Sequence, residues 1–170
     1  MDVSVLISKR HAGAEIDAAS VPAQPNTGAH AVRYAQVFAA TLLAFFALDV
    51  AWLILVGDLF FKRQLGALLR AQPEMIAAAA FYSIYAIGCT TLVVAPALGS
   101  RSAMAAATRG AVLGLTAYAT FDLTNLAILD GWTLAVTLVD MAWGIVATTI
   151  ACLAGYWTGR RLVMNIPLQP

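Results

Sequence analysis

The chain has 170 residues, of which 61% are hydrophobic and only 11% are charged. A soluble domain carries about 25% charged residues, so these charges are too few to cover a surface that faces water. The formal net charge of +1 argues against nucleic-acid binding, which requires clustered basic residues.

The first 33 residues differ in composition from the rest of the chain. They mix Ala, Ser, Pro and Gly with scattered charges. Their apolar stretch Val3 to Ile7 is too short for the core of a signal peptide. We therefore expect residues 1–33 to form a disordered cytoplasmic tail in front of the folded part.

Four long apolar runs follow within residues 34–157. A membrane-spanning helix needs about 20 residues, because each adds about 1.5 Å toward a hydrocarbon core about 30 Å thick. Open strands are excluded, since their backbone groups would be unpaired in lipid. The sequence predicts an all-α, four-transmembrane-helix antiparallel bundle, with a short cytoplasmic tail at 158–170. The predicted spans are 34–57, 75–98, 110–129 and 134–157.

Short connections join the predicted spans. Asp58 to Glu74 mixes apolar and basic residues, so it is either a short helix lying along the membrane interface or an ordinary loop. Asp130 to Thr133 is a tight turn, which makes the third and fourth spans antiparallel neighbours.

Four spans place both chain ends on one side of the membrane. Basic residues favour the cytoplasmic side, so their distribution predicts cytoplasmic termini. The terminal side carries Lys9, Arg10, Arg33, Arg101, Arg109, Arg160 and Arg161, and the opposite side carries Lys62, Arg63 and Arg70.

Three predicted spans each contain one aspartate, and all three fall at a similar depth. Asp49 lies eight residues before Gly57, Asp122 seven before Leu129 and Asp140 six after Leu134. These separations correspond to about 9 to 12 Å below the same end of the bundle. Each carboxyl facing lipid would cost about 2.5 to 3.5 kcal/mol, so we expect the three to face one another inside the bundle.

Other polar and aromatic residues are expected in the same layer. Tyr82 reaches it from the second span, and neighbours three or four positions away are expected to act as partners on the same helix. These neighbours are Tyr118 and Asn125 for Asp122, Thr137 and Trp143 for Asp140, and Trp52 for Asp49.

Small residues indicate how the helices approach one another. Gly110, Gly114, Tyr118 and Asp122 recur every four residues along one stripe of the third span. Small residues allow close helix packing in membranes, and Gly144 is expected to do the same on the fourth span.

Several kinds of site are excluded by the residues that the spans lack. Lys9 and Lys62 lie outside the spans, which excludes a retinal-type Schiff base. His11 and His30 lie in the predicted tail, which leaves no intramembrane histidine for haem or a di-iron centre. We expect no cofactor. The two cysteines, Cys89 and Cys152, match neither a disulfide framework nor a zinc spacing.

Segments around the aspartates resemble an uncharacterised bacterial family of predicted membrane proteins, domain of unknown function 2177. The resemblance covers about Phe38 to Tyr156 and implies a four-helix protein of the bacterial inner membrane, with no activity, substrate or cofactor to transfer. The segments that carry it are Phe46–Leu53, Arg63–Gly66, Tyr118–Leu126 and Leu138–Gly144.

Three functions remain open at this stage. The first hypothesis is a binding or transport module for a small molecule, a lipid or protons, built on Asp49, Asp122 and Asp140. A transporter of this size is expected to work as a homodimer. The second is a lipid-modifying enzyme that uses an aspartate as general base or Mg²⁺ ligand. The third is an accessory subunit of a larger membrane complex, in which the polar layer only specifies assembly.

Overall fold

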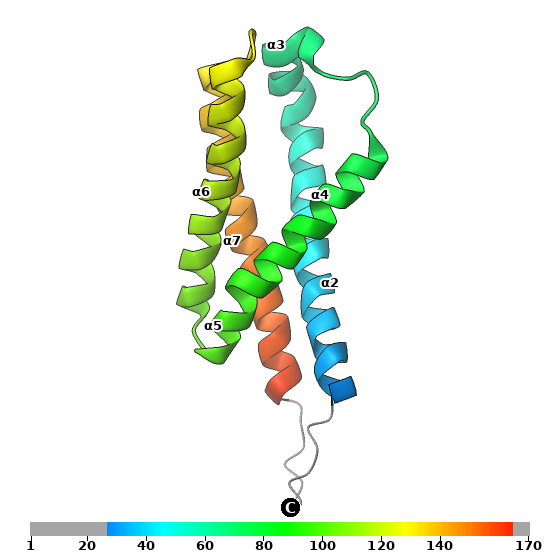
Figure 1. Ribbon diagram of the computed structural model, residues 1–170, viewed down its shortest axis with the longest axis vertical. Helices are drawn as coiled ribbons and strands as arrows, with labels where there is room; N and C mark the ends of the chain where they lie inside the picture. Colours follow the sequence, from blue (N-terminus) through cyan, green and yellow to red (C-terminus); the bar gives the residue numbers. More distant parts are fainter. Residues whose placement is uncertain (1–26, 165–170) are drawn as a thin grey trace, which may run out of the picture.

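The computed structural model describes residues 27–164, so residues 1–26 and 165–170 of the two predicted tails lie outside the described part. The described secondary structure consists of helices, arranged as four rods (Figure 1). Each rod holds a segment long and apolar enough to cross a membrane. These segments are His30–Gly57, Met75–Gly99, Ala103–Ile128 and Leu134–Leu162. The predicted all-α, four-span fold is confirmed.

The first rod is longer than its predicted span. A helix does not have to end where its apolar stretch ends, and residues 27–33 are helical rather than part of a disordered tail. At the other end, the first part of the predicted connection continues the rod until Gly66, whose φ of 48° turns the chain. The elements are α2 (Thr27–Trp52), the π-helix η2 (Leu53–Phe61), α3 (Lys62–Leu65) and the 3₁₀-helix η3 (Gly66–Leu68).

The second rod contains a π-helical turn in its middle. Glu74 caps its start, since its carboxylate accepts hydrogen bonds from the N–H groups of Ile76 and Ala77. Pro96 has no N–H and crowds the preceding turn, which explains why the wider π-turn comes directly before it. The N–H of Ala95 accordingly donates to the carbonyl of Thr90. The elements are α4 (Met75–Gly88), the π-helix η4 (Cys89–Val94) and α5 (Ala95–Gly99).

The third and fourth rods form a hairpin. Helix α6 (Ala103–Ile128) begins at Ser102, whose hydroxyl accepts a 3.1 Å hydrogen bond from the N–H of Ala105. A turn with Gly131 at φ 89° leads into α7 (Leu134–Met164). Residues 158–164 of the predicted C-terminal tail thus continue the last helix.

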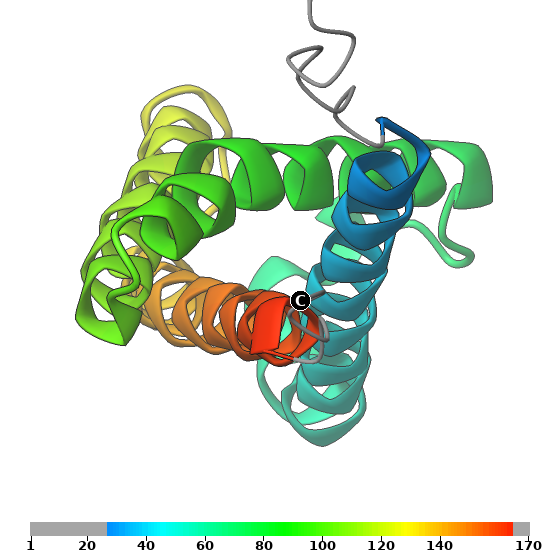
Figure 2. The same ribbon diagram turned by 90° about the horizontal axis from the view of Figure 1, so that it is seen from below.

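Helix α7 lies between α2 and α6 and packs against both, while the second rod crosses the bundle diagonally (Figures 1 and 2). Two groups of buried residues form the core. One lies toward the chain ends around Val94, Ala106 and Tyr156, and the other surrounds Phe45 and Ala147. The second group lies one helical turn from Asp49 and positions the candidate site.

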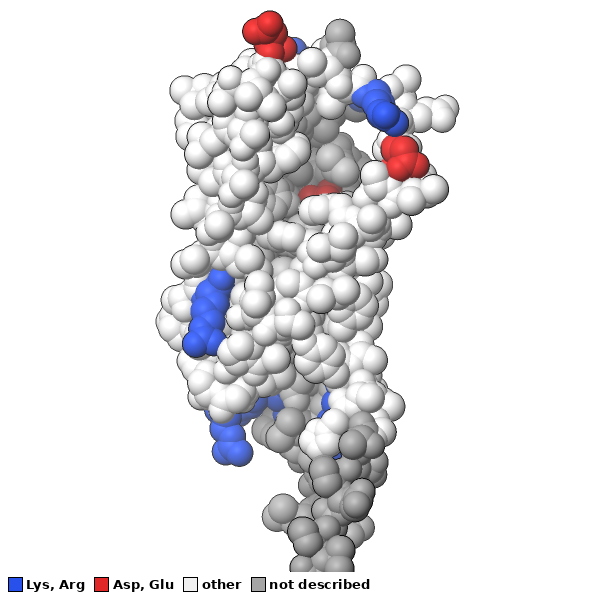
Figure 3. Space-filling model, viewed as in Figure 1, with Lys and Arg blue, Asp and Glu red and all other residues white. Residues whose placement is uncertain are grey.

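The outer surface of the rods is apolar. Ile54 and Ile76 leave 74% and 79% of their surface exposed, and Met104 and Ile128 are similarly open. Most charged side chains gather toward the two ends of the molecule in the view of Figure 3. Apolar side chains on this scale outside a core require a lipid environment, so the bilayer is the partner of these faces.

Candidate functional site

Asp49 is the best-bonded carboxylate of the predicted layer. Its Oδ2 accepts a 2.6 Å hydrogen bond from the Tyr82 hydroxyl of α4, and its Oδ1 accepts one of 3.3 Å from Trp143 Nε1 of α7. One side chain therefore joins α2 to two other rods. Charge-assisted hydrogen bonds of this kind are the strong ones inside an apolar environment.

Two tryptophans stack beside Asp49. The rings of Trp52 and Trp143 lie parallel, with centroids 4.4 Å apart and planes at 4°. Trp143 uses its indole N–H for Asp49, whereas the buried Nε1 of Trp52 has no hydrogen-bond partner in the described part of the chain. The stack holds the Trp143 ring in place, so that its N–H points at the carboxylate.

Asp122 lies in a different environment. It is completely buried, with 0% of its surface exposed, although it is an acid on a membrane helix. Neither of its carboxyl oxygens has a hydrogen-bond partner among residues 27–164. Its backbone neighbours on the α6 stripe, Gly114 and Gly110, are buried too, so Asp122 lies on the packed face of α6.

Asp140 is half-buried and lies within electrostatic range of both Asp122 and Asp49. Asp140 therefore interacts electrostatically with each of the other two carboxyl groups. Asn125 is also half-buried and lies one turn from Asp122.

The expected partners on the same helices do not supply the bonds. Trp143 donates to Asp49 on another helix, not to Asp140. Thr137 accepts a 3.1 Å bond from Trp132 and donates one of 3.3 Å to the carbonyl of Thr133. A serial spacing of three or four places two side chains on one face, but rotamers and neighbouring helices decide which atoms meet.

The close approach of α6 and α7 depends on glycine. A Cβ at Gly114 would collide with the carbonyl oxygen of Gly144, and one at Gly144 would collide with the ring of Tyr118. A Cβ at Gly110 would lie 3.2 Å from the Cα of Thr149. The Tyr118 ring thus occupies the space that Gly144 leaves free, within electrostatic range of Asp49 and Asp140.

A model of a family of predicted membrane proteins matches residues 34–157, which is most of the chain. The chain belongs to the DUF2177 family. The match confirms the resemblance inferred from the motifs between Phe38 and Tyr156. No curated protein and no solved structure shows significant similarity to the chain.

The structure adds two residues to the site of this DUF2177 chain that sequence reasoning did not select. Tyr85 and Thr148 share a 2.8 Å hydrogen bond between α4 and α7, and Tyr85 stands edge-on to Tyr118 at 6.4 Å. Tyr85 lies three positions after Tyr82, so the helical period was the signal that would have found it.

The three aspartates do not form one tight cluster. Within residues 27–164, no group of three or more His, Cys, Asp or Glu side chains is arranged so that it could share a metal ion. The acids of the DUF2177 chain instead form a series. Asp49 on α2 accepts two hydrogen bonds, Asp140 on α7 lies in electrostatic range of both other acids, and Asp122 on α6 is buried without a hydrogen-bond partner among the described residues.

Proposed function

We propose that this chain is a multi-pass protein of the bacterial inner membrane that binds or transports protons or a small cationic or hydroxylated molecule. Asp49, Asp122 and Asp140 provide the binding groups, and Tyr82 and Asn125 orient what they bind. The chain's membership of a membrane-protein family and its four spans supply the setting. The unpartnered carboxyl of Asp122 carries the proposal.

A carboxyl retained only to hold helices together stabilises the bundle through the hydrogen bonds that it makes. Asp122 makes none in the described structure and is fully buried. A buried polar group without a partner costs free energy, and an intramembrane acid costs more than a hydroxyl. Asp122 therefore costs stability without adding a hydrogen bond to the bundle. A ligand or a proton that binds its carboxyl group best explains why an acid occupies this position.

The arrangement of the three acids also supports the movement of a proton or a small ligand from one acid to the next. Asp140 lies in electrostatic range of Asp122 and Asp49, which links α6 to α2 through α7. Figure 3 shows an acidic side chain at the bottom of a hollow in the apolar band, between the rods. A recessed acid reached from the surface is what a binding or transport site requires.

Both termini are proposed to face the cytoplasm. The start of α2 and the end of α7 lie at the same end of the molecule (Figure 1). More basic residues belong to that end than to the other, which favours the cytoplasmic side for it. The basic residues at the terminal end are Arg33, Arg101, Arg109, Arg160 and Arg161, against Lys62, Arg63 and Arg70 at the opposite end.

A working transporter of this size is proposed to be a homodimer or part of a larger membrane complex. Four helices make only a thin wall around a polar path, and the outer faces of the rods are apolar. A second copy would complete the enclosure, since helices in membranes associate through packing of such faces.

The test compares purified wild type with Asp122→Asn in liposomes that contain a pH-sensitive dye, under an imposed membrane potential. We expect the wild type to admit protons faster than empty liposomes, and Asp122→Asn to lose this flux because asparagine cannot carry a proton. Asp130→Asn serves as the matched control, since Asp130 is exposed in the turn between α6 and α7.

Thermal unfolding of Asp49→Asn, Asp122→Asn and Asp140→Asn, singly and together, accompanies the flux assay. Equal flux in wild type and Asp122→Asn, together with large and non-additive losses of stability in the three variants, would mark the acids as a structural network instead.

A further inference from the structure

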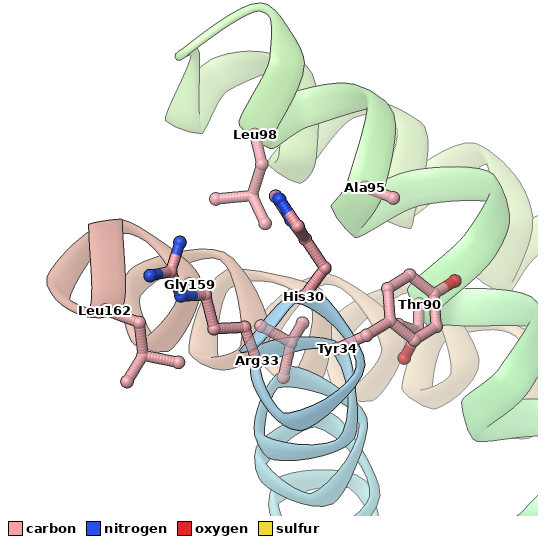
Figure 4. A pocket seen from close by; sticks show the side chains of 9 residues that line it. His30, Arg33, Tyr34, Thr90, Ala95, Leu98, Gly159 and Leu162 are labelled. Carbon is pink, nitrogen blue, oxygen red and sulfur yellow. The ribbon is translucent and has the colours of Figure 1, made fainter. Parts of the chain in front are cut away.

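A second polar feature lies at the end of the bundle that holds the chain termini, away from the aspartates. A cavity of about 170 Å³ opens there between α2, the second rod and α7. Figure 4 shows its side chains, with His30 pointing toward Leu98 and Arg33 extending toward α7. The residues that matter for its chemistry are His30, Arg33, Thr90, Leu98, Gly159 and Leu162.

The cavity lies at the level of the membrane surface. Three of the apolar segments begin or end at His30, Gly99 and Leu162, and these positions surround the cavity or adjoin it. Thr90 lies nine residues before Gly99, which places it at most about 13 Å deeper along its rod. The cavity therefore runs from the lipid headgroup level past the ester groups toward the hydrocarbon layer.

Thr90 is the unexplained polar group of this region. It is completely buried, and its hydroxyl has no hydrogen-bond partner in the described part of the chain. Its neighbour Thr91 donates to the carbonyl of Ile87, and Thr41 donates to that of Val37. Thr90 lies in the π-turn η4 and lines the cavity. Its hydroxyl oxygen is covered in this structure, so an acceptor that enters from the mouth would reach it only after the surrounding side chains move aside.

The charged groups at the mouth select the sign of that ligand. The guanidinium of Arg33 offers several N–H donors in a fixed plane, a geometry that suits phosphate oxygens. The imidazole of His30 adds a further donor at the same wall. Among residues 27–164, no acidic residue lines this cavity, and its remaining walls in that part of the chain are apolar or aromatic.

We propose that this cavity binds the phosphate and glycerol region of an anionic phospholipid from the leaflet at the terminal end. The phosphate would lie at Arg33 and His30, and an ester carbonyl would accept from the Thr90 hydroxyl. The cavity volume of about 170 Å³ is more than a single water molecule needs. This space suits a headgroup region and leaves the acyl chains in the bilayer. Basic cavities between membrane helices are typical sites for anionic headgroups.

The order of groups distinguishes a lipid from a free anion. A phospholipid presents an anion first and uncharged acceptors one layer deeper, as the cavity presents cations at its mouth and a hydroxyl further in. A free phosphate would use Arg33 and His30 and leave Thr90 unsatisfied. This inference does not depend on the aspartates, whose site lies on the other core group.

The experiment is native mass spectrometry of the full chain in detergent, with added phosphatidylglycerol or with phosphatidylcholine of the same acyl chains. We expect phosphatidylglycerol to bind and phosphatidylcholine to bind much more weakly. Arg33→Gln should weaken phosphatidylglycerol binding roughly tenfold and Thr90→Val by about threefold, since a charged and a neutral hydrogen bond are lost. Arg33→Lys should retain most of the binding.

Two controls keep the result specific. Arg109→Gln removes one cation from the exposed surface of α6, and Thr91→Val removes an exposed hydroxyl that bonds its own helix; both should bind like wild type. A thermal unfolding curve for each variant separates loss of binding from loss of the fold.

Three outcomes would overturn the lipid assignment. Equal binding of the two lipids would remove the role of charge, and an equal effect of Arg109→Gln would show that surface charge alone is responsible. If inorganic phosphate displaces the lipid while Thr90→Val leaves binding unchanged, the cavity recognises a free anion.

Discussion

Tyr82 and Asp49 are joined by a 2.6 Å hydrogen bond that connects α4 to α2 inside the membrane domain. The two residues are 33 positions apart in the sequence, and residues 69–74 join the end of the first rod to the start of α4. Phe46 supports the pair, because its ring stands edge-on to that of Tyr82 at 5.1 Å. This bond helps to fix the rotation of the second rod about its axis.

Tyr82→Phe should destabilise the protein by about 1 kcal/mol, because it removes the donor to Asp49 Oδ2 and leaves the ring packing intact. Tyr85→Phe offers a comparison, since it removes a bond to the hydroxyl of Thr148 rather than to a carboxylate. Unfolding in a denaturing detergent measures both. A double-mutant cycle of Tyr82→Phe with Asp49→Asn should show coupling, and additive effects would contradict a direct bond.

Asp122→Asn should leave stability unchanged or raise it, and Asp49→Asn should lower it. Asp122 makes no hydrogen bond among the described residues, so the substitution removes a buried acid and loses no partner. Asp49 accepts two hydrogen bonds, one on each carboxyl oxygen. Asparagine has only one side-chain oxygen, so its NH2 group would face one of the two donors. The same unfolding assay tests both variants, and a clear loss with Asp122→Asn would count against a functional cost at this position.

Trp143→Phe should cost more stability than Trp52→Phe. Either change keeps an aromatic ring in the 4.4 Å stack, but only Trp143 donates its indole N–H to Asp49. The Nε1 of Trp52 is buried without a partner in the described structure, so its removal relieves an unsatisfied donor. We expect the free energies of unfolding of the two variants, measured by thermal melting, to differ by about 1 kcal/mol. Equal losses would show that stacking alone accounts for both residues.

Gly144→Ala should destabilise the hairpin of α6 and α7 by about 1 to 3 kcal/mol, because its Cβ meets the Tyr118 ring. Gly114→Ala should be at least as costly, since the obstacle is the backbone oxygen of Gly144 and backbone cannot rotate away. Gly88→Ala is the matched control on α4, where nothing lies within 4 Å of the added carbon. A melting temperature for Gly88→Ala below that of wild type by as much as for Gly144→Ala would refute the contact argument.

The number of spans could be predicted from the sequence because the rise of a helix per residue is fixed, and the same count predicts a similar depth for the three aspartates. Counting residues from Gly57, Leu129 and Leu134 gives depth directly. Helix ends were less predictable, because Thr27 and Met164 lie beyond the apolar stretches that define the spans. Hydrophobic length marks the membrane crossing, and polar residues continue a helix into the surface layer without changing that length.

The pairings within the layer could not be predicted from one sequence. The helical spacing predicts Trp143 as a partner of Asp140 on the same helix, but its N–H reaches Asp49 on another. That outcome depends on the rotation of α7 relative to α2 and on the ring of Trp52, which the spacing along either helix does not contain. The absence of any partner for Asp122 in the described structure was equally hidden, because Asn125 and Tyr118 stand at suitable spacings.

The π-turn η4 (Cys89–Val94) divides the second rod into two parts. The side chains of one part are rotated about the helix axis relative to those of the other, compared with an unbroken α-helix. One residue changes the direction of a helix face by about 100°, so the wider turn shifts everything after it relative to everything before it. Helix α4 can therefore direct Tyr82 and Tyr85 at the aspartate layer, while α5 directs Leu98 at the terminal cavity. Deleting one residue from this turn would straighten the rod and align only one of the two ends with its site.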